Sequence, residues 1–243
     1  MRRMIFAAAK GGTGKTTTAV NVAAGFALMG RKVALLDLDP YAGATVALGL
    51  TPEAETFSSA LARGSLAPAL RETGVAGLYV LPGGPGMADA ARRMGGTPKA
   101  LRAAVTALEG FDLALLDTPP AVGPLTVAAL SCGGELVLPV AASFADLATV
   151  APFLLEAAAV TRDLAPDLRL RALVPSRVIR TRLAFETLNT LRKNYPETTR
   201  TEIRQGAAIA EATAAGEPVL TYAPASTGAE DFHALTRELS RER

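Results

Sequence analysis

Lys10-Gly-Gly-Thr-Gly-Lys-Thr-Thr17 stands between an apolar run of strand length, residues 4–9, and a stretch with the apolar spacing of a helix, residues 16–29. Glycines let backbone N–H groups turn inward toward phosphate oxygens, and the N-terminus of the following helix adds partial positive charge. We expect Lys15 to reach the β- and γ-phosphates and the Thr16 hydroxyl to face Mg²⁺. The stretch therefore predicts a phosphate-binding loop for a nucleoside triphosphate.

The loop departs from the usual pattern G-x-x-x-x-G-K-[ST], because Ala9 stands at the first glycine position and Lys10 is an additional lysine. A purely structural turn would explain the glycines but not the lysine and threonine after them. A dinucleotide-binding fingerprint would use two of the glycines, but Thr17 occupies its third glycine position and it has no role for Lys15. We therefore expect ATP to be held by Gly11, Gly12, Thr13, Gly14, Lys15, Thr16 and Thr17.

The composition is that of an ordinary globular protein, with 243 residues, 49% hydrophobic and 20% charged. No shift in composition divides the chain, so we expect a single domain over residues 1–243. The apolar runs fall short of the ~18–20 residues that span a bilayer, and the loop interrupts the apolar start too early for a signal peptide. We therefore expect a cytoplasmic protein. The single Cys132 excludes a disulfide framework and a cysteine metal site within one chain.

Apolar runs of strand length alternate with stretches of helical spacing along the whole chain. Several of the runs are almost continuously apolar, as in central strands that are covered on both faces. This alternation predicts an α/β fold of the P-loop NTPase type, with a mostly parallel central sheet flanked by helices on both faces. Further strands are expected at 32–38, 77–81, 111–117, 135–140, 168–175 and 218–222, and helices at 16–29, 57–63, 97–109, 123–131, 146–163, 181–194, 206–215 and 227–241.

Three acidic residues close two of these strands. Asp37 and Asp39 fall on the same side by alternation, and Pro40 then forces the chain out of the sheet. Beside a phosphate loop, they can hold Mg²⁺-bound water and orient the attacking water. Capping of the following turn is the alternative for both. Asp117 ends the strand before Thr118 and fits a Walker B role, in which it holds Mg²⁺ through water.

Basic residues are concentrated between Thr161 and Arg204. This stretch has ten basic and five acidic residues, a net charge of +5, against +2 for the whole chain. Such a local excess suits a polyanionic partner, although a solvated helix face gives the same count.

With these motifs in place, the chain resembles the ParA/MinD family of deviant Walker A ATPases, and within it the small ParA (Soj-like) partition proteins. The resemblance rests on residues 10–17, on Asp37-Leu-Asp-Pro-Tyr-Ala-Gly-Ala-Thr45 and on Leu116-Asp-Thr-Pro-Pro120. Weaker similarity continues through residues 136–140, 209–212 and 224–228. The loop with a second lysine is highly specific to this family.

The resemblance implies an ATP-driven switch, a homodimer in which two subunits enclose two ATP molecules face to face. Lys10 would reach the partner subunit's nucleotide, by the logic of an arginine finger. Asp39 would help to activate water, and Asp37 and Asp117 would organise the Mg²⁺ shell. Hydrolysis in such proteins is slow until a ParB-type partner stimulates it. The ATP-bound dimer binds DNA without sequence preference, so the resemblance implies chromosome or plasmid partition on the nucleoid.

This sequence differs from the family pattern at two places. Tyr41 stands where the family usually has Gln, which bears on the switch behaviour. Small residues in 203–211 replace basic or amide residues of relatives, which leaves Arg204 as the candidate DNA contact of that segment. The other candidate DNA contacts are Arg177, Arg180 and Arg182.

Other functions on the same fold remain open at this point. A related switch that positions another protein cargo would have the same sequence features. A MinD-like membrane protein would need a broad apolar face on its last helix, whereas Phe232, Leu235 and Leu239 form only a narrow stripe. A metabolic enzyme of the dethiobiotin synthetase kind would leave Lys10 without a role. A scaffold that no longer hydrolyses ATP is disfavoured by the complete set of acidic and loop residues.

Overall fold

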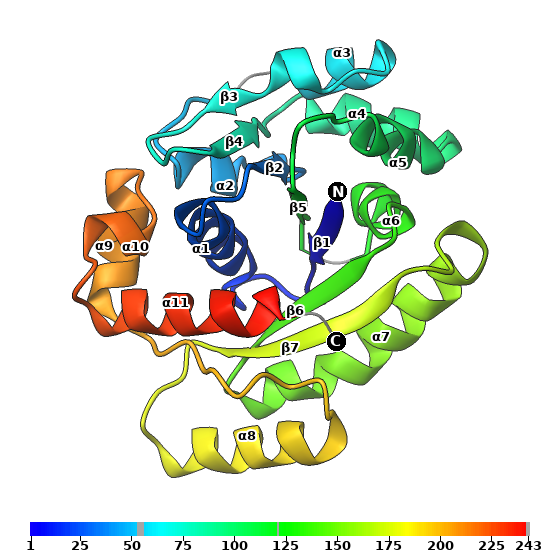
Figure 1. The fold of residues 1–243 in the computed structure, drawn as a ribbon. Coiled ribbons are helices and arrows are strands. Elements are labelled where there is room, and N and C mark those ends of the chain that lie inside the picture. The colour runs from blue at the N-terminus through cyan, green and yellow to red at the C-terminus, as the bar shows by residue number, and fades with distance from the viewer. Residues whose placement is uncertain (53–55, 121, 242–243) are drawn as a thin grey trace.

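Seven strands form one sheet at the centre of the structure, a computed structural model that describes residues 1–52, 56–120 and 122–241 (Figure 1). The strands follow the order β3-β4-β2-β5-β1-β6-β7, and every neighbouring pair is parallel except β3 and β4. This confirms the mostly parallel sheet predicted from the sequence. The strands are β1 (Arg2–Phe6), β2 (Val33–Asp37), β3 (Arg71–Glu72), β4 (Leu78–Leu81), β5 (Leu113–Asp117), β6 (Glu135–Ala141) and β7 (Arg169–Ser176).

The central strands β2 and β5 are buried along their whole length, because helices cover both faces of the sheet. In the register of the sheet, Asp117 pairs with Phe6 on one side and with Asp37 on the other. The carboxyl ends of β1, β5 and β2 therefore meet at one edge, where ligands bind in sheets of this kind.

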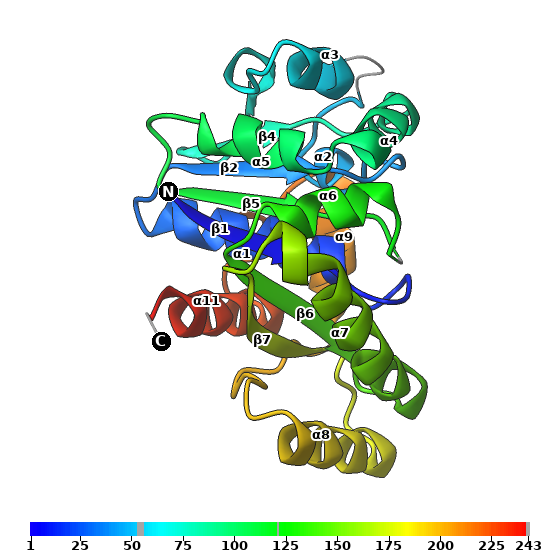
Figure 2. The same ribbon diagram turned by 90° about the vertical axis from the view of Figure 1, so that its right-hand side faces the viewer.

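Helices form a layer on each face of the sheet (Figures 1 and 2). On one face α1 packs against the strands and against α11, and α2, α9 and α10 complete the layer. On the other face α6 packs against α4, α5 and α7, α3 packs against α4, and α8 packs against α7. The helices are α1 (Lys15–Leu28), α2 (Gly43–Val46), α3 (Thr56–Ala62), α4 (Met87–Gly96), α5 (Lys99–Thr106), α6 (Pro124–Ser131), α7 (Phe144–Leu164), α8 (Arg182–Asn194), α9 (Ala207–Ala215), α10 (Val219–Tyr222) and α11 (Thr227–Ser240), with a 3₁₀ turn η1 (Ala67–Ala69).

Three of these helices begin at a side-chain cap. Ser143, Thr181 and Ser226 precede α7, α8 and α11, and each hydroxyl accepts a hydrogen bond from the backbone N–H three residues later. By length and composition α7 is apolar enough to cross a membrane. Only 29% of this apolar window is buried; Val150 and Phe153 on its inner face pack in the core beside the sheet.

The strand expected at 218–222 is wrong, because residues Val219–Tyr222 form the short helix α10. The Val219 N–H donates a hydrogen bond to the Asn21 side chain of α1 at 2.8 Å. An apolar run this short fits a strand or one helical turn equally well. In the structure, its contact with α1 on the face of the sheet is made by a helical turn. Four further elements were not expected from the sequence: α2, β3 and η1, which have four residues or fewer, and the ten-residue helix α4.

Candidate nucleotide-binding site

The loop at residues 10–17 joins the carboxyl end of β1 to α1, whose first residue is Lys15. Gly12 and Gly14 have φ angles of 82° and 81°, a left-handed region that residues with a Cβ rarely enter. The Gly14 carbonyl accepts the Thr18 N–H at 2.8 Å, which is the first hydrogen bond of the helix. The loop therefore lies directly ahead of a helix N-terminus, the arrangement that binds phosphate.

Lys15 and Asp117 form a buried ion pair beneath this loop. Their Nζ and Oδ1 atoms lie 2.7 Å apart, and the two side chains are 7% and 0% exposed. Lys15 Nζ also donates to the Thr16 hydroxyl at 3.3 Å. The lysine, the hydroxyl and the acidic residue that the sequence assigns to ATP and Mg²⁺ thus lie together at the edge where β1 and β5 end.

The Asp117 carboxylate fits a Mg²⁺ site. Burial raises its pKa, whereas the charge of Lys15 and hydrogen bonds from Lys15 and Thr16 act to lower it. Its Oδ2 atom is buried and accepts no hydrogen bond from the residues that the structure describes. A buried carboxylate oxygen needs a partner, and Mg²⁺ or a water bound to it would supply one. In the described part of the chain no three acidic, His or Cys side chains form a cluster that could hold a metal ion.

The oxygens of Asp37 are already engaged by the protein. Oδ2 accepts the Thr45 N–H at 2.8 Å and the Thr45 hydroxyl at 2.7 Å, and Oδ1 accepts the Asp39 N–H at 3.1 Å. Burial and then the charge of Asp117 raise the pKa of Asp37 to about 7, against these hydrogen bonds. The structure thus places Asp37 as a support for the chain between β2 and α2, and its part in the Mg²⁺ shell stays a prediction.

Asp39 lies just beyond the end of β2 and is 8% exposed. Its Oδ1 atom accepts the Tyr41 N–H at 2.9 Å, so it caps the turn as the alternative interpretation expected. Tyr41 itself is 87% exposed, and Ala42 adopts a φ angle of 54°. The turn therefore presents a large aromatic side chain to solvent beside the candidate site.

Lys10 has an environment opposite to that of Lys15. Its side chain is 52% exposed, and its Nζ lies 3.6 Å from Oδ1 of Asp146 in the first turn of α7. Lys10 therefore lies on the exposed rim of the loop, paired with the first turn of α7.

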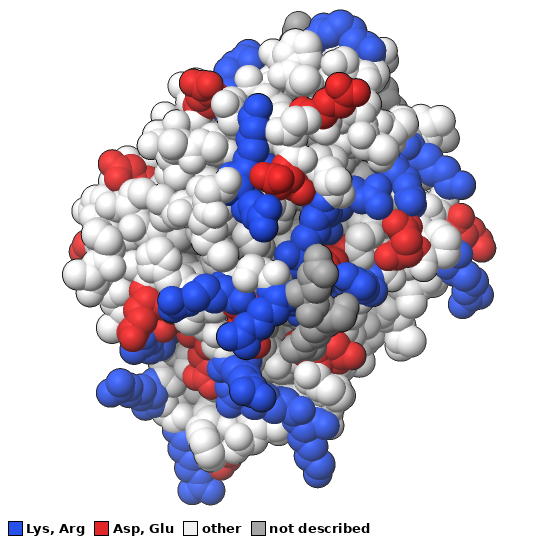
Figure 3. Space-filling view, viewed as in Figure 1, with Lys and Arg blue, Asp and Glu red and all other residues white. Residues whose placement is uncertain are grey.

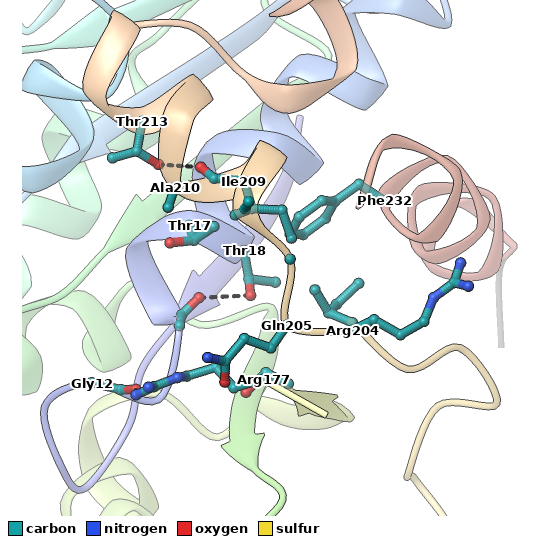
Figure 4. Close-up of a pocket in the computed structure, with 15 residues that line it drawn as sticks. Gly12, Thr17, Thr18, Arg177, Arg204, Gln205, Ile209, Ala210, Thr213 and Phe232 are labelled. Carbon is teal, nitrogen blue, oxygen red and sulfur yellow. Dashed lines mark hydrogen bonds between the residues drawn. The ribbon is translucent and has the colours of Figure 1, made fainter. Parts of the chain in front are cut away.

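A cavity of about 770 Å³ opens beside the loop. It runs from the loop glycines and Thr17 of α1 to the segment before α9 and to Phe232 of α11 (Figure 4). A nucleotide with its phosphates in the loop would have its sugar and base in this cavity, whose size suits a small-molecule ligand.

The four candidate DNA-binding arginines differ in exposure and in the groups that their guanidinium groups already bind. Arg180 is exposed, and Arg182 is 91% exposed with a surface ion pair to Glu186 at 2.8 Å. Arg177 donates from Nη1 to the Gly12 carbonyl at 2.7 Å. Arg204 pairs with Asp231 and Glu230, which raise the pKa of its guanidinium, and in Figure 4 its side chain points toward α11, away from Gly12 and Arg177.

Part of the basic excess between Thr161 and Arg204 has a structural role. Arg169 and Arg171 group with Arg2 around Glu135 near the amino ends of the strands. Figure 3 shows Lys and Arg spread over this face, where both termini lie, with Asp and Glu between them. The net charge of residues 161–204 therefore overstates the positive charge that is available to bind a polyanion.

A loop with its lysine buried against an acidic residue of the neighbouring strand defines a P-loop nucleoside-triphosphatase. A family model described as "AAA domain" matches residues 1–170 of this chain. The chromosome-partitioning ATPase Soj of Thermus thermophilus is 38% identical over 241 residues, which cover 98% of this chain and 95% of Soj.

Two solved structures extend the comparison. The septum site-determining protein MinD of Pyrococcus horikoshii, complexed with Mg-ADP, has a TM-score of 0.82 at 25% identity and covers 99% of this chain and 96% of its own. Cobyrinic acid a,c-diamide synthase of Mycobacterium smegmatis, with a bound ATP analogue and magnesium, has a TM-score of 0.82 at 27% identity and covers 98% and 94%. The chain belongs to the ParA/MinD family of P-loop ATPases, and is an ATP hydrolase that uses Mg²⁺.

Two residues at this edge were not assigned a role from the sequence. Thr45 bonds Asp37 and also accepts the Gly83 N–H at 2.9 Å, so it links the ends of β2 and β4. Ser176, the last residue of β7, donates to the Thr13 carbonyl at 2.5 Å. A Thr and a Ser far from the loop in sequence give no local signal, because their partners are set only by the order of the strands.

Proposed function

We propose that this protein is a partition-type ATPase switch, a single domain over residues 1–243 that dimerises with ATP and binds DNA without sequence preference in the cytoplasm, on the nucleoid. A ParB-type protein would stimulate its slow hydrolysis. The observation that carries the proposal is the 38% identity with a chromosome-partitioning ATPase over nearly the whole of both chains. The environment of Lys10 supports the dimer, and the exposed Arg180 and Arg182 at the start of α8 support DNA binding.

The position of Lys10 supports the dimer. Its side chain is half-exposed on the rim of the loop, beside Asp146. In a face-to-face dimer the same charge would approach the partner subunit's nucleotide and stabilise the charge that develops there. The homodimer is thus the assembly in which both loop lysines have a function.

Hydrolysis needs positioning and charge neutralisation more than covalent chemistry. The loop N–H groups and Lys15 would bind the β- and γ-phosphates, and Thr16 and Asp117 would hold Mg²⁺. Bound there, Mg²⁺ would neutralise charge on the phosphate oxygens. Asp39 would orient the attacking water from the neighbouring strand end.

Arg180 and Arg182 are the strongest of the four proposed DNA contacts, because within residues 1–52, 56–120 and 122–241 neither guanidinium is bound to the core of the protein. Arg177 and Arg204 are weaker, since the phosphate loop and two carboxylates engage them. The MinD-like alternative loses its support, because Phe232, Leu235 and Leu239 of α11 are fully buried and not available to a membrane.

The deciding experiment is binding to a random-sequence duplex with ATP, with ADP and without nucleotide, across a salt series. The Asp39→Ala variant is expected to retain ATP unhydrolysed and so to give the ATP state for the assay. We expect tight binding with ATP alone, weakening as salt rises. Changing Arg180 and Arg182 to Ala should lower the salt slope by about two, as for two lost phosphate contacts. The matched control is Arg63→Ala, an exposed arginine beyond α3.

Absence of DNA binding in every nucleotide state would contradict the proposal. The function would then be that of a relative that positions another protein cargo. An equal loss of binding in the Arg180, Arg182 and Arg63 variants would contradict the assignment of the DNA surface to the start of α8.

A further inference from the structure

The carboxyl end of β7 is attached to the phosphate loop by two consecutive side chains. Ser176 Oγ donates to the Thr13 carbonyl at 2.5 Å, and Arg177 Nη1 donates to the Gly12 carbonyl at 2.7 Å. The first pair is separated by 163 residues and the second by 165. Figure 4 shows the Arg177 side chain reaching to Gly12 along the mouth of the cavity.

These two bonds set the direction of two peptide groups. A peptide unit is planar and trans, so its N–H points opposite to its carbonyl. When the carbonyls of Gly12 and Thr13 point toward β7, the N–H groups of Thr13 and Gly14 are turned the other way. Successive N–H groups on one side of a loop form an anion-binding concavity. The β7 side chains therefore act on the groups that bind phosphate, without touching it.

The environment of the two side chains favours a role in the loop over an incidental contact. Ser176 and Thr13 are 2% and 4% exposed, and a buried hydrogen bond of this kind is costly to lose. Arg177 has a φ angle of 49°, a left-handed conformation that disfavours residues with a Cβ. Such strain persists where the surroundings enforce it.

Backbone hydrogen bonds to residues 203–205 of the same chain hold Arg177 in this conformation. The Val178 N–H donates to the Ile203 carbonyl and the Gln205 N–H donates to the Val178 carbonyl, both at 3.0 Å. The backbone at residue 177 is thus held between the phosphate loop and the segment before α9.

We propose that Ser176 and Arg177 are positioning residues that orient the Thr13 and Gly14 amides for the phosphates of ATP, and that Arg177 serves the loop in place of contacting DNA. The inference rests on the ATPase site and not on the proposed partition function. It predicts weaker ATP binding in the absence of any DNA when either side chain is lost.

The test is the Kd of Mg-ATP measured by calorimetry on the full chain without DNA. Ser176→Ala should raise the Kd about fivefold, the effect of one net hydrogen bond. Ser176→Thr keeps the hydroxyl and should stay within about twofold of the unaltered protein. Arg63→Ala is the control, since Arg63 is an exposed arginine just beyond α3 that has no part in either proposed site, and its Kd should not change.

Arg177→Gly separates positioning from general stability. Glycine adopts the left-handed conformation without strain, so the melting temperature should stay the same or rise. The lost bond to Gly12 should nevertheless raise the Kd of Mg-ATP about threefold or more. A merely structural arginine would move both measurements in the same direction.

The proposal is overturned if Ser176→Ala and Arg177→Gly both bind Mg-ATP within about twofold of the unaltered protein, because the loop would then hold its own shape. Equal losses with Ser176→Ala and Ser176→Thr would also overturn it. If Ser176→Ala fails to fold, Arg177→Gly and Ser176→Thr still decide. Failure of DNA binding in the unaltered protein would leave these measurements intact and would bear only on the partition function.

Discussion

Two lysines five residues apart in one loop have opposite environments. Lys15 is 7% exposed and forms its ion pair with Asp117 at 2.7 Å, whereas Lys10 is 52% exposed and lies 3.6 Å from Asp146. A buried, paired lysine beside the phosphate position belongs to its own nucleotide site. An exposed lysine on the rim is available to a second subunit, and an exposed ion pair holds it only weakly.

At the residue scale, we expect Lys10→Ala to remain monomeric with Mg²⁺ and a non-hydrolysable ATP analogue, while the unaltered protein dimerises. Its Kd for the nucleotide should stay within about twofold, and its stability within about 1 kcal/mol, because the Lys10–Asp146 pair is exposed on one side. Light scattering after size exclusion gives the mass. Lys15→Ala is the control and should lose nucleotide binding itself. If Lys10→Ala still dimerised, the proposed contact of Lys10 with the partner subunit's nucleotide would be contradicted.

At the scale of elements, α1 and α11 approach each other closely because Gly25 has no side chain. A Cβ at Gly25 would collide with the Thr236 hydroxyl and would lie 3.0 Å from its Cβ and Cγ2 atoms. Phe232, Leu235 and Leu239 are then buried between α11 and the sheet side of α1. One glycine thus allows the last helix to cover the helix that begins at the phosphate loop.

We therefore expect Gly25→Ala to lower the free energy of unfolding by about 1–3 kcal/mol, as for other overpacked cores. Urea unfolding measures the change. Gly74→Ala is the control, because a Cβ at Gly74 meets no atom within 4 Å. Adding Thr236→Ala to Gly25→Ala removes two of the three clashing atoms and should restore part of the loss. Equal stabilities of the Gly25 and Gly74 variants would refute the close packing.

At the scale of the whole molecule, Glu135 connects the amino ends of three strands with the last helix. It pairs with Arg2 at 2.6 Å, Arg169 at 2.9 Å and Arg171 at 3.5 Å. Arg171 also donates to the carbonyls of Leu239 and Arg241 at the end of α11. Burial alone would raise the pKa of Glu135, but hydrogen bonds from Arg2 and Arg169 outweigh it and hold the pKa below 4.5.

A carboxyl group with a lowered pKa contributes stability above its unfolded-state pKa, and this is lost as the pH falls through the folded-state value. Glu135→Gln should therefore be less stable than the unaltered protein at pH 7, by about 1.5–3 kcal/mol, as for lost hydrogen bonds to a charged group. The difference should shrink as the pH falls below 4.5. Chemical unfolding at several pH values tests this, with Glu186→Gln, an acid in an exposed surface pair, as control. A difference that stays constant to low pH would contradict the ion-pair origin.

The sequence pattern was sufficient to predict features that depend only on the spacing of nearby residues. The loop glycines, Lys15 and the acidic strand ends could be found from the sequence, since parallel strands bring their carboxyl ends to one edge. The strand expected at 218–222 was wrong, because four apolar residues do not distinguish a strand from a helical turn. The role of Arg204 could not be read either, because its carboxylate partners lie 26 and 27 residues away.

By itself the sequence determined the sheet class, the phosphate loop and the family, because these follow from residue types at short spacing. Only the tertiary structure decided which groups meet across the strand order: Lys15 with Asp117, Asp37 with Thr45, and Ser176 and Arg177 with the loop carbonyls. It also separated the exposed Arg180 and Arg182, at the start of α8, from the arginines that bond to the phosphate loop, to Asp231 or to Glu135. The reason is that such pairings join residues distant in the chain, and only the packed sheet brings them within hydrogen-bond distance.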